Sequence, residues 1–137
     1  MADEQSNGTL LRADSVVKHF PVRGGVLNRV KAKVHAVNGV SLTIKRGETL
    51  GVVGESGCGK STLGKVLIRL TEPTDGSIEF GGTDITSLDH EGMMPYRRRM
   101  QIIFQDPYSS LNPRLTVRQT ITEAVKFHSV VPDSEIR

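Results

Sequence analysis

The amino-acid sequence predicts an α/β fold, in which a strand, a glycine-rich loop and a helix form a core joined to an antiparallel β subdomain. Apolar and polar residues alternate on both sides of Asn38 and Gly39, as in antiparallel strands joined by a tight turn. A short apolar run at residues 49–53 then leads through several glycines into a helical repeat that begins at Lys60. The chain has 137 residues, of which 36% are hydrophobic, and a formal net charge of +3. These values are typical of one folded domain, and the single cysteine, Cys58, excludes a disulfide scaffold.

The N-terminal third of the chain is expected to contain several strands. Residues 1–9 are polar and predict a disordered start, and residues 10–20 predict a strand that enters a loop at Pro21. The Asn-Gly turn predicts a hairpin of residues 34–37 and 40–44. Eight Lys or Arg and three Asp or Glu lie in this third, up to residue 47. Few aromatic residues accompany them, so the charges predict solvated loops, and no nucleic-acid partner is expected.

The middle of the chain alternates between strand and helix patterns. Residues 49–53 predict a strand buried on both faces, because the run is short, mostly apolar and free of charged residues. Residues 60–70 predict a helix, because leucine and valine recur three and four positions apart. Residues 77–80 predict a further strand, closed by the pair Gly81-Gly82.

The C-terminal part predicts two helices with a strand between them. Pro95 suits the first turn of a helix that continues through residues 97–99, and residues 101–105 predict the strand. Thr116 and Gln119 have the spacing of a capping box. The final helix would begin there, and its apolar face would be formed by Val117, Ile121, Ala124 and Val125.

The glycine-rich stretch carries the most specific chemical signal in the sequence. Residues 54–61 match the pattern G-x-x-x-x-G-K-[ST] and lie between a predicted strand and a predicted helix, as that pattern requires. Glycines let the backbone curl so that its N–H groups surround an anion at the helix N-terminus. A chance glycine turn is the alternative, and the flanking elements argue against it. The predicted phosphate-binding residues are Gly54, Glu55, Ser56, Gly57, Cys58, Gly59, Lys60, Ser61 and Thr62.

Two of these side chains have chemistry suited to a nucleoside triphosphate. Lys60 can reach the β- and γ-phosphates as a mobile positive charge. The hydroxyl of Ser61 can bind Mg²⁺, which also bridges phosphate oxygens. Cys58 occupies a position in the loop where a small side chain suffices.

Three longer stretches resemble the ATP-binding subunits of ABC transporters, specifically the importers of dipeptides and oligopeptides. They read GESGCGKST, PTDGSIEFGG and RRRMQIIFQDPYSSLNPRLTV. The resemblance runs from about Leu11 to the last residue, and it implies that residues 10–137 are the N-terminal part of an ATP-binding domain, incomplete on its C-terminal side. It implies ATP and Mg²⁺ as cofactors, and a P-loop NTPase core as the fold.

The resemblance also implies roles for two residues outside the loop. Gln105 matches the glutamine that contacts Mg²⁺ or the attacking water and couples the nucleotide to the membrane subunits. Lys60 and Gln105 would be the catalytic residues present, and Ser61 and Gln105 the metal-binding ones. Phe20 matches the aromatic residue that stacks on adenine, although a Phe before a proline is more often a core residue.

The physiological role implied by the resemblance is ATP-driven import of di- or oligopeptides. The implied partners are transmembrane permease subunits and a second, homologous ATP-binding subunit. The implied location is peripheral, at the cytoplasmic face of the bacterial inner membrane.

Three motifs of an ABC ATPase do not occur downstream of Gln105: an LSGGQ-type signature, a strand ending in Asp followed by a catalytic Glu, and a switch histidine. The 137-residue chain is therefore expected to bind ATP without hydrolysing it, because the water-activating base and the opposing signature are missing. The alternatives are a nucleotide-binding fragment without turnover and another P-loop NTPase or small kinase.

Overall fold

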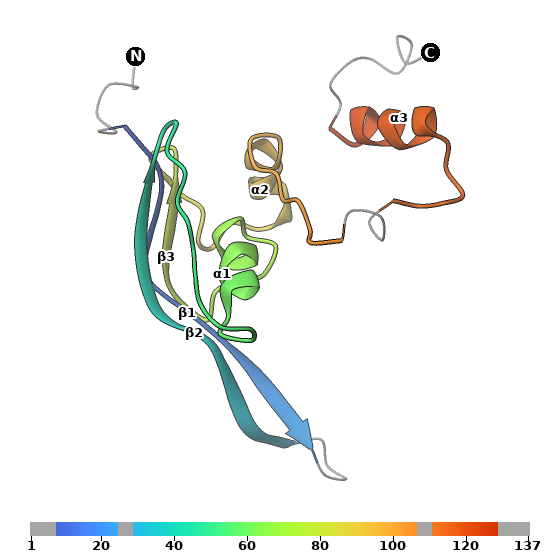
Figure 1. The fold of residues 1–137 in the computed structure, drawn as a ribbon. Coiled ribbons are helices and arrows are strands. Elements are labelled where there is room, and N and C mark those ends of the chain that lie inside the picture. Colours follow the sequence, from blue (N-terminus) through green and yellow to red (C-terminus); the bar gives the residue numbers. More distant parts are fainter. Residues whose placement is uncertain (1–7, 25–28, 107–110, 129–137) are drawn as a thin grey trace. The chain divides into compact units, whose positions relative to one another are not determined.

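The computed structural model describes residues 8–24, 29–106 and 111–128 (Figure 1). Residues 1–7, most of the predicted disordered start, lie outside these ranges. The chain divides into two compact units, Met1–Met93 and Met94–Arg137. In chain order the elements are β1 (Thr9–Gly24), β2 (Arg29–Lys45), α1 (Lys60–Leu67), β3 (Asp75–Phe80), β4 (Thr83–Asp84), α2 (His90–Arg97) and α3 (Val117–Phe127).

The first unit is built on a four-stranded antiparallel sheet with the strand order β2-β1-β3-β4. Leu11 of β1 lies in register with Ile44 of β2 on one side and with Phe80 of β3 on the other. Helix α1 contacts β1 and β2 (Figure 1). Buried side chains from the sheet, from α1 and from residues 85 and 93 form the core: Leu11, Ala13, Val16, Val37, Leu63, Val66, Ile78, Phe80, Ile85 and Met93.

The predicted hairpin at Asn38-Gly39 is wrong, because β2 runs through both residues as one strand. Pairing shifts from Val16 with Val40 to Lys18 with Val37, so β2 advances by one residue more than β1. Such an extra residue is a β-bulge, and the positive φ of Gly39, 69°, is used there instead of in a turn.

The predicted loop after residue 20 is also wrong over residues 21–24, which continue β1 and pair with β2. Pro21 lies opposite Lys33. Proline is tolerated in an edge strand, and β3 pairs with β1 only as far as Val17. The remaining part of that predicted loop, from residue 25, lies outside the described residues.

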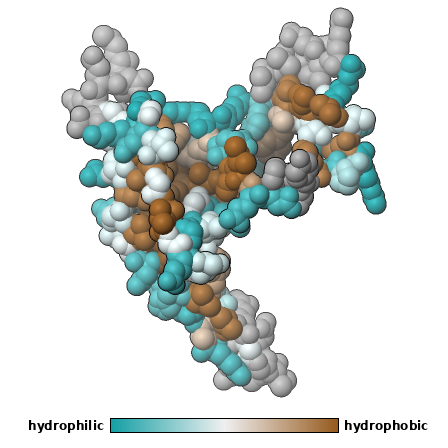
Figure 2. Space-filling view, in the orientation of Figure 1, coloured by the Kyte–Doolittle hydropathy of each residue, from teal (hydrophilic) through white to brown (hydrophobic). Residues whose placement is uncertain are grey.

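Neither residues 49–53 nor residues 101–105 form the predicted strands. A strand is defined by its ladder of hydrogen bonds, and no segment of the described residues pairs with either one. Most of their side chains are accordingly exposed, with Val53 96% and Ile103 86% accessible. Figure 2 shows apolar side chains gathered in patches on the visible surface.

Helix α1 starts at Lys60 as predicted and ends at Leu67, three residues before the predicted end at Leu70. Arg69 follows with a φ of 57° and a buried side chain. Its Nε donates to the carbonyl oxygen of Ile85, and its terminal nitrogen donates to that of Leu88, both at 2.9 Å. These bonds satisfy part of the buried guanidinium and tie the end of α1 to the chain that leads into α2.

Pro95 lies inside α2 and not in its first turn, which corrects that prediction. The helix begins after Asp89, whose carboxylate accepts the N–H of Gly92 at 2.8 Å. A proline within a helix removes one backbone bond, and α2 ends soon after it, at Arg97.

The capping box of α3 is confirmed. The Thr116 hydroxyl accepts the N–H of Gln119 at 3.3 Å, and the Gln119 side chain accepts the N–H of Thr116 at 2.8 Å. None of the residues in α3 is buried, so the predicted apolar face remains accessible. In the parts of the chain that the structure describes, no helix is long and apolar enough to cross a membrane.

Candidate functional site

The glycine-rich loop ends at the first residue of α1, with Gly59 as the N-cap. Gly59 has a φ of 97° and Gly57 one of 82°, in the left-handed region that other residues rarely adopt. A Cβ atom on Gly59 would overlap the carbonyl oxygen of Ala36 in β2. Glycine is therefore required at position 59 both by the backbone conformation and by the close approach of the sheet.

The Lys60 side chain folds back over this loop. Its ammonium donates to the carbonyl oxygen of Gly54 at 2.7 Å and to that of Glu55 at 2.5 Å, and its Nζ lies 3.5 Å from Cys58 Sγ. The loop thus curves around the amine and holds a positive charge beside the start of α1. Charge-assisted bonds of this kind fix a flexible lysine at one place.

The start of α1 fits a phosphate group. The first N–H groups of any helix lack partners within it, and no side chain caps this one. Those free donors, the positive end of the helix dipole and the Lys60 charge act at the same place. Ser61 follows with an exposed side chain. A phosphate chain with Mg²⁺ suits this set of donors, with Ser61 as the candidate for the ion.

The remaining loop residues are all accessible. Glu55, Ser56 and Cys58 are exposed, whereas Thr62 is half-buried. Gly54 faces the thiol of Cys58, since a Cβ on Gly54 would lie 2.8 Å from Sγ. The structure therefore places residues 54–60 in one loop at the start of α1, and their phosphate-binding role stays a prediction.

A cavity of about 380 Å³ opens beside the loop, on the side of β2. Its walls combine loop residues with mostly apolar side chains of β2, of α1 and of the chain before the loop. The lining residues are His35, Ala36, Val37, Asn38, Val40, Val52, Val53, Cys58, Gly59, Lys60 and Leu63. The sequence pattern gives no hint of His35, because its place is set by the path of β2.

Phe20 lies in β1, in register with Val34, and does not line this cavity. Its ring is 40% exposed, and Lys18 Nζ lies 5.1 Å from the ring centroid, within reach of a cation–π interaction. Gln105 belongs to the second unit, and its side chain is exposed. The roles expected for both residues stay predictions.

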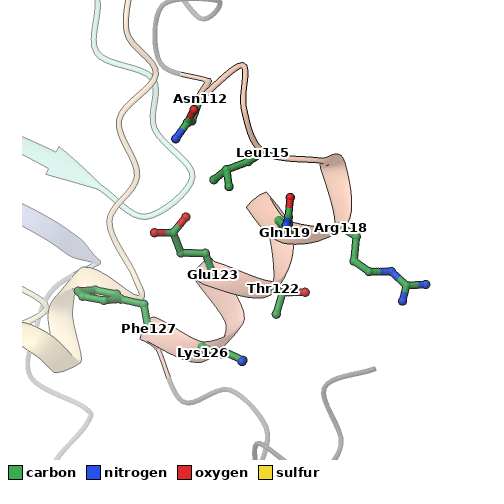
Figure 3. A pocket seen from close by; sticks show the side chains of 8 residues that line it. All are labelled: Asn112, Leu115, Arg118, Gln119, Thr122, Glu123, Lys126 and Phe127. Atoms are coloured by element: carbon green, nitrogen blue, oxygen red, sulfur yellow. The ribbon is translucent and has the colours of Figure 1, made fainter.

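A second, larger cavity of about 820 Å³ lies entirely within the second unit (Figure 3). Its lining comes from α3 and the turn before it: Asn112, Leu115, Arg118, Gln119, Thr122, Glu123, Lys126 and Phe127. In Figure 3 the side chains of Asn112, Leu115 and Glu123 gather on one side of the helix, and that of Arg118 points away from them. No residue of the sequence-predicted site lines it, whereas Cys58, Gly59 and Lys60 line the smaller cavity.

Residues 8–24, 29–106 and 111–128 contain no group of three or more His, Cys, Asp or Glu side chains able to hold a metal ion. The Ser61 hydroxyl and the oxygens of a phosphate chain are the candidate ligands for an ion at the loop. This donor set suits Mg²⁺, which prefers oxygen and is usually bound through phosphates.

A glycine-rich loop that enters a helix through Gly-Lys-Ser, with the lysine folded over the loop, defines the P-loop class of nucleotide-binding proteins. The family model described as ABC transporter matches residues 37–136, and the chain belongs to that family.

Relatives of known name agree with this assignment. The chain is 50% identical over 123 residues to the oligopeptide transport ATP-binding protein AppF of Bacillus subtilis, covering 89% of this chain and 37% of that protein. It is 54% identical over 117 residues to a probable peptide ABC transporter ATP-binding protein, y4tS, of Sinorhizobium fredii, covering 85% of this chain and 33% of that protein. The chain thus spans about a third of the length of these relatives, and the sequence resemblance is confirmed.

Solved structures confirm the fold class. The dimeric bacterial ABC transporter cassette MJ0796 superposes with a TM-score of 0.70 at 25% identity, covering 93% of this chain and 52% of that one. The cassette cbiO1 of Clostridium perfringens superposes with a TM-score of 0.67 at 27% identity, covering 96% of this chain and 47% of that one. The observed α/β fold with its antiparallel sheet is therefore part of an ABC cassette.

Proposed function

We propose that the chain binds Mg²⁺-ATP at residues 54–62. The observation that carries this proposal is the uncapped start of α1, with the Lys60 ammonium held over the loop at 2.7 Å from the Gly54 carbonyl oxygen. In the bound state, the Lys60 ammonium would donate to phosphate oxygens in place of these carbonyl groups. The phosphate chain would also accept hydrogen bonds from the N–H groups at the start of α1. A related cassette was solved with ADP and phosphate, at 26% identity, which supports the same ligand class.

Three side chains are assigned further contacts. The Ser61 hydroxyl would bind Mg²⁺, and the Gln105 amide would contact Mg²⁺ or the attacking water. Phe20, with its accessible ring, would stack on the adenine.

In the complete protein we assign ATP hydrolysis that powers the import of di- or oligopeptides. The support is the names of the relatives, which refer to peptide transport and, in Escherichia coli, to glutathione import. The partners would be transmembrane permease subunits and a second ATP-binding subunit, and the location the cytoplasmic face of the inner membrane.

For the 137 residues alone we expect binding without turnover, because the sequence contains no signature motif, catalytic Glu or switch histidine after Gln105. Binding lowers a reaction barrier only where contacts strengthen in the transition state. If the purified chain released phosphate from ATP and the Lys60→Ala variant did not, this expectation would be refuted. Such a result would point to another P-loop NTPase.

A ligand series tests the binding site. ATP and ADP should bind to the chain, and AMP should bind at least about tenfold more weakly, because it lacks the β-phosphate that Lys60 reaches, a difference of about 1.4 kcal/mol. Equal affinities for ADP and AMP, measured by titration calorimetry in the presence of Mg²⁺, would show that the loop does not hold the phosphates.

A further inference from the structure

Strand β2 forms a wall of the phosphate loop. The carbonyl oxygen of Ala36 lies where a side chain on Gly59 would stand, so the backbones of the sheet and of the loop meet directly. His35, the preceding residue, lines the same cavity as Gly59 and Lys60. A ligand held by the loop would therefore have the imidazole of His35 beside it.

The position of His35 is supported by its neighbour on β1. The two rings of His19 and His35 have centroids 3.8 Å apart with an interplanar angle of 44°, and the two residues lie in register across the strands. The backbone N–H of His19 donates to Thr74 Oγ1 at 3.0 Å, which fixes that part of β1. His35 itself is exposed, so its ring is both positioned and accessible.

We propose that His35 contacts the nucleoside moiety of the nucleotide whose phosphates occupy residues 54–62, an inference that rests on the proposed function. The phosphates need the N–H groups at the start of α1 and the Lys60 charge. The cavity walls that lead away from Lys60 are largely apolar, with Val37, Val52 and Leu63 among them. Such walls suit a planar base better than charged oxygens.

The chemistry of imidazole fits this assignment. Its ring can stack on a base, and its nitrogens can donate to or accept from ribose hydroxyl groups. Phe20 is a competing candidate for the base, because successive residue pairs along two strands face opposite sides of the sheet and a ligand on one side meets only one of the two rings. His19 pairs with His35, and Phe20 pairs with Val34 one step further along.

The test compares two ligands, Mg²⁺-ATP and Mg²⁺-tripolyphosphate, which share phosphates and differ in the nucleoside. Calorimetry on the full chain would use the wild type, His35→Ala and the control His90→Ala, an exposed histidine that does not line the cavity. We expect His35→Ala to weaken ATP binding by about fivefold, as for the loss of about 1 kcal/mol, and to leave tripolyphosphate binding unchanged. His90→Ala should change neither affinity.

Several outcomes would overturn the inference. ATP affinity unchanged in His35→Ala, or an equal loss for both ligands, would show that His35 does not contact the nucleoside. If Phe20→Ala weakened ATP binding and His35→Ala did not, the contact with the base would be assigned to Phe20 alone. If the wild type bound neither ligand, the proposed function itself would fail. Should His35→Ala lose its fold, His35→Val gives the same comparison, because valine suits a strand and has neither an aromatic ring nor a hydrogen-bonding side chain.

Discussion

The carbonyl oxygen of Ala36 and the α-carbon of Gly59 meet without room for a side chain between them. This contact joins β2 to the loop that begins α1, although the two residues belong to elements separated in the sequence. The sheet therefore sets the position of the phosphate loop through backbone atoms, which no change of side chain on β2 can easily loosen.

Gly59→Ala should destabilise the chain more than Gly82→Ala does. Gly82 has a similar positive φ of 83° with open space around it, so its replacement adds only backbone strain of about 1–2 kcal/mol. Gly59→Ala adds the overlap with Ala36 to the same strain. Urea unfolding of the two variants measures the difference, and equal losses would show that the contact between β2 and the loop is not tight.

Arg69→Met should lower the free energy of unfolding by about 1–3 kcal/mol, because it removes the Arg69 donors from the buried carbonyl group of Ile85 and the partly buried one of Leu88. Arg46→Met, which changes an exposed arginine in the same unit, is the matched control and should have little effect. Similar stabilities of the two variants in urea would mean that Arg69 does not hold the end of α1 in place.

Mg²⁺-ATP should protect Cys58 from alkylation. The thiol is exposed, and it lies in the loop 3.5 Å from the lysine that would reach the phosphates. A maleimide should therefore label the chain more slowly when the nucleotide is saturating. The control is the double variant Cys58→Ser, Ser87→Cys, whose exposed thiol lies outside the cavity lining. Its labelling rate should be the same with and without the nucleotide. Labelling of Cys58 at the same rate with and without nucleotide would contradict the proposed site.

Acid should weaken the fold partly through Asp84. Hydrogen bonds from Thr86, first from its side chain and then from its backbone N–H at 2.8 Å, hold the pKa of the Asp84 carboxyl below its ordinary value. A lowered folded-state pKa gives stability that is complete above the unfolded value of about 3.9 and is lost as the pH falls through the lower folded value. Asp84→Asn should reduce the dependence of stability on pH in that range, as measured by urea unfolding at a series of pH values. An unchanged dependence would exclude Asp84 as a contributor.

Local features of the structure could be predicted from the sequence because the residues that determine them are neighbours. The start of α1 at Lys60, the conformation of its glycine loop and the capping box of Thr116 and Gln119 depend on contacts within a few residues. Features that depend on hydrogen bonds between strands could not be predicted in this way. The Asn-Gly pair permits a positive φ equally well in a hairpin turn and in a bulge, and the long pairing of β1 with β2 selects the bulge.

The apolar run at residues 49–53 shows that composition alone can also predict a strand where the structure has none. Its composition is that of a buried strand, but a strand requires a partner, and none pairs with it in the described ranges 8–24, 29–106 and 111–128. For the site, the sequence pattern locates the glycine-rich loop and the helix that starts at Lys60, while the binding roles of the loop residues stay predictions. The closeness of Ala36 and His35 to that loop depends on the register of the sheet, which short-range patterns do not determine.

The central claim, that Lys60 and its loop bind the phosphates of Mg²⁺-ATP, is tested most directly by calorimetry of a single variant. Lys60→Ala should weaken Mg²⁺-ATP binding at least about tenfold, or about 1.4 kcal/mol, because a charge-assisted contact to phosphate is lost. Lys65→Ala removes the same charge from an exposed position on the same helix and should leave the affinity unchanged. Equal affinities of the wild type and Lys60→Ala for Mg²⁺-ATP would contradict the claim.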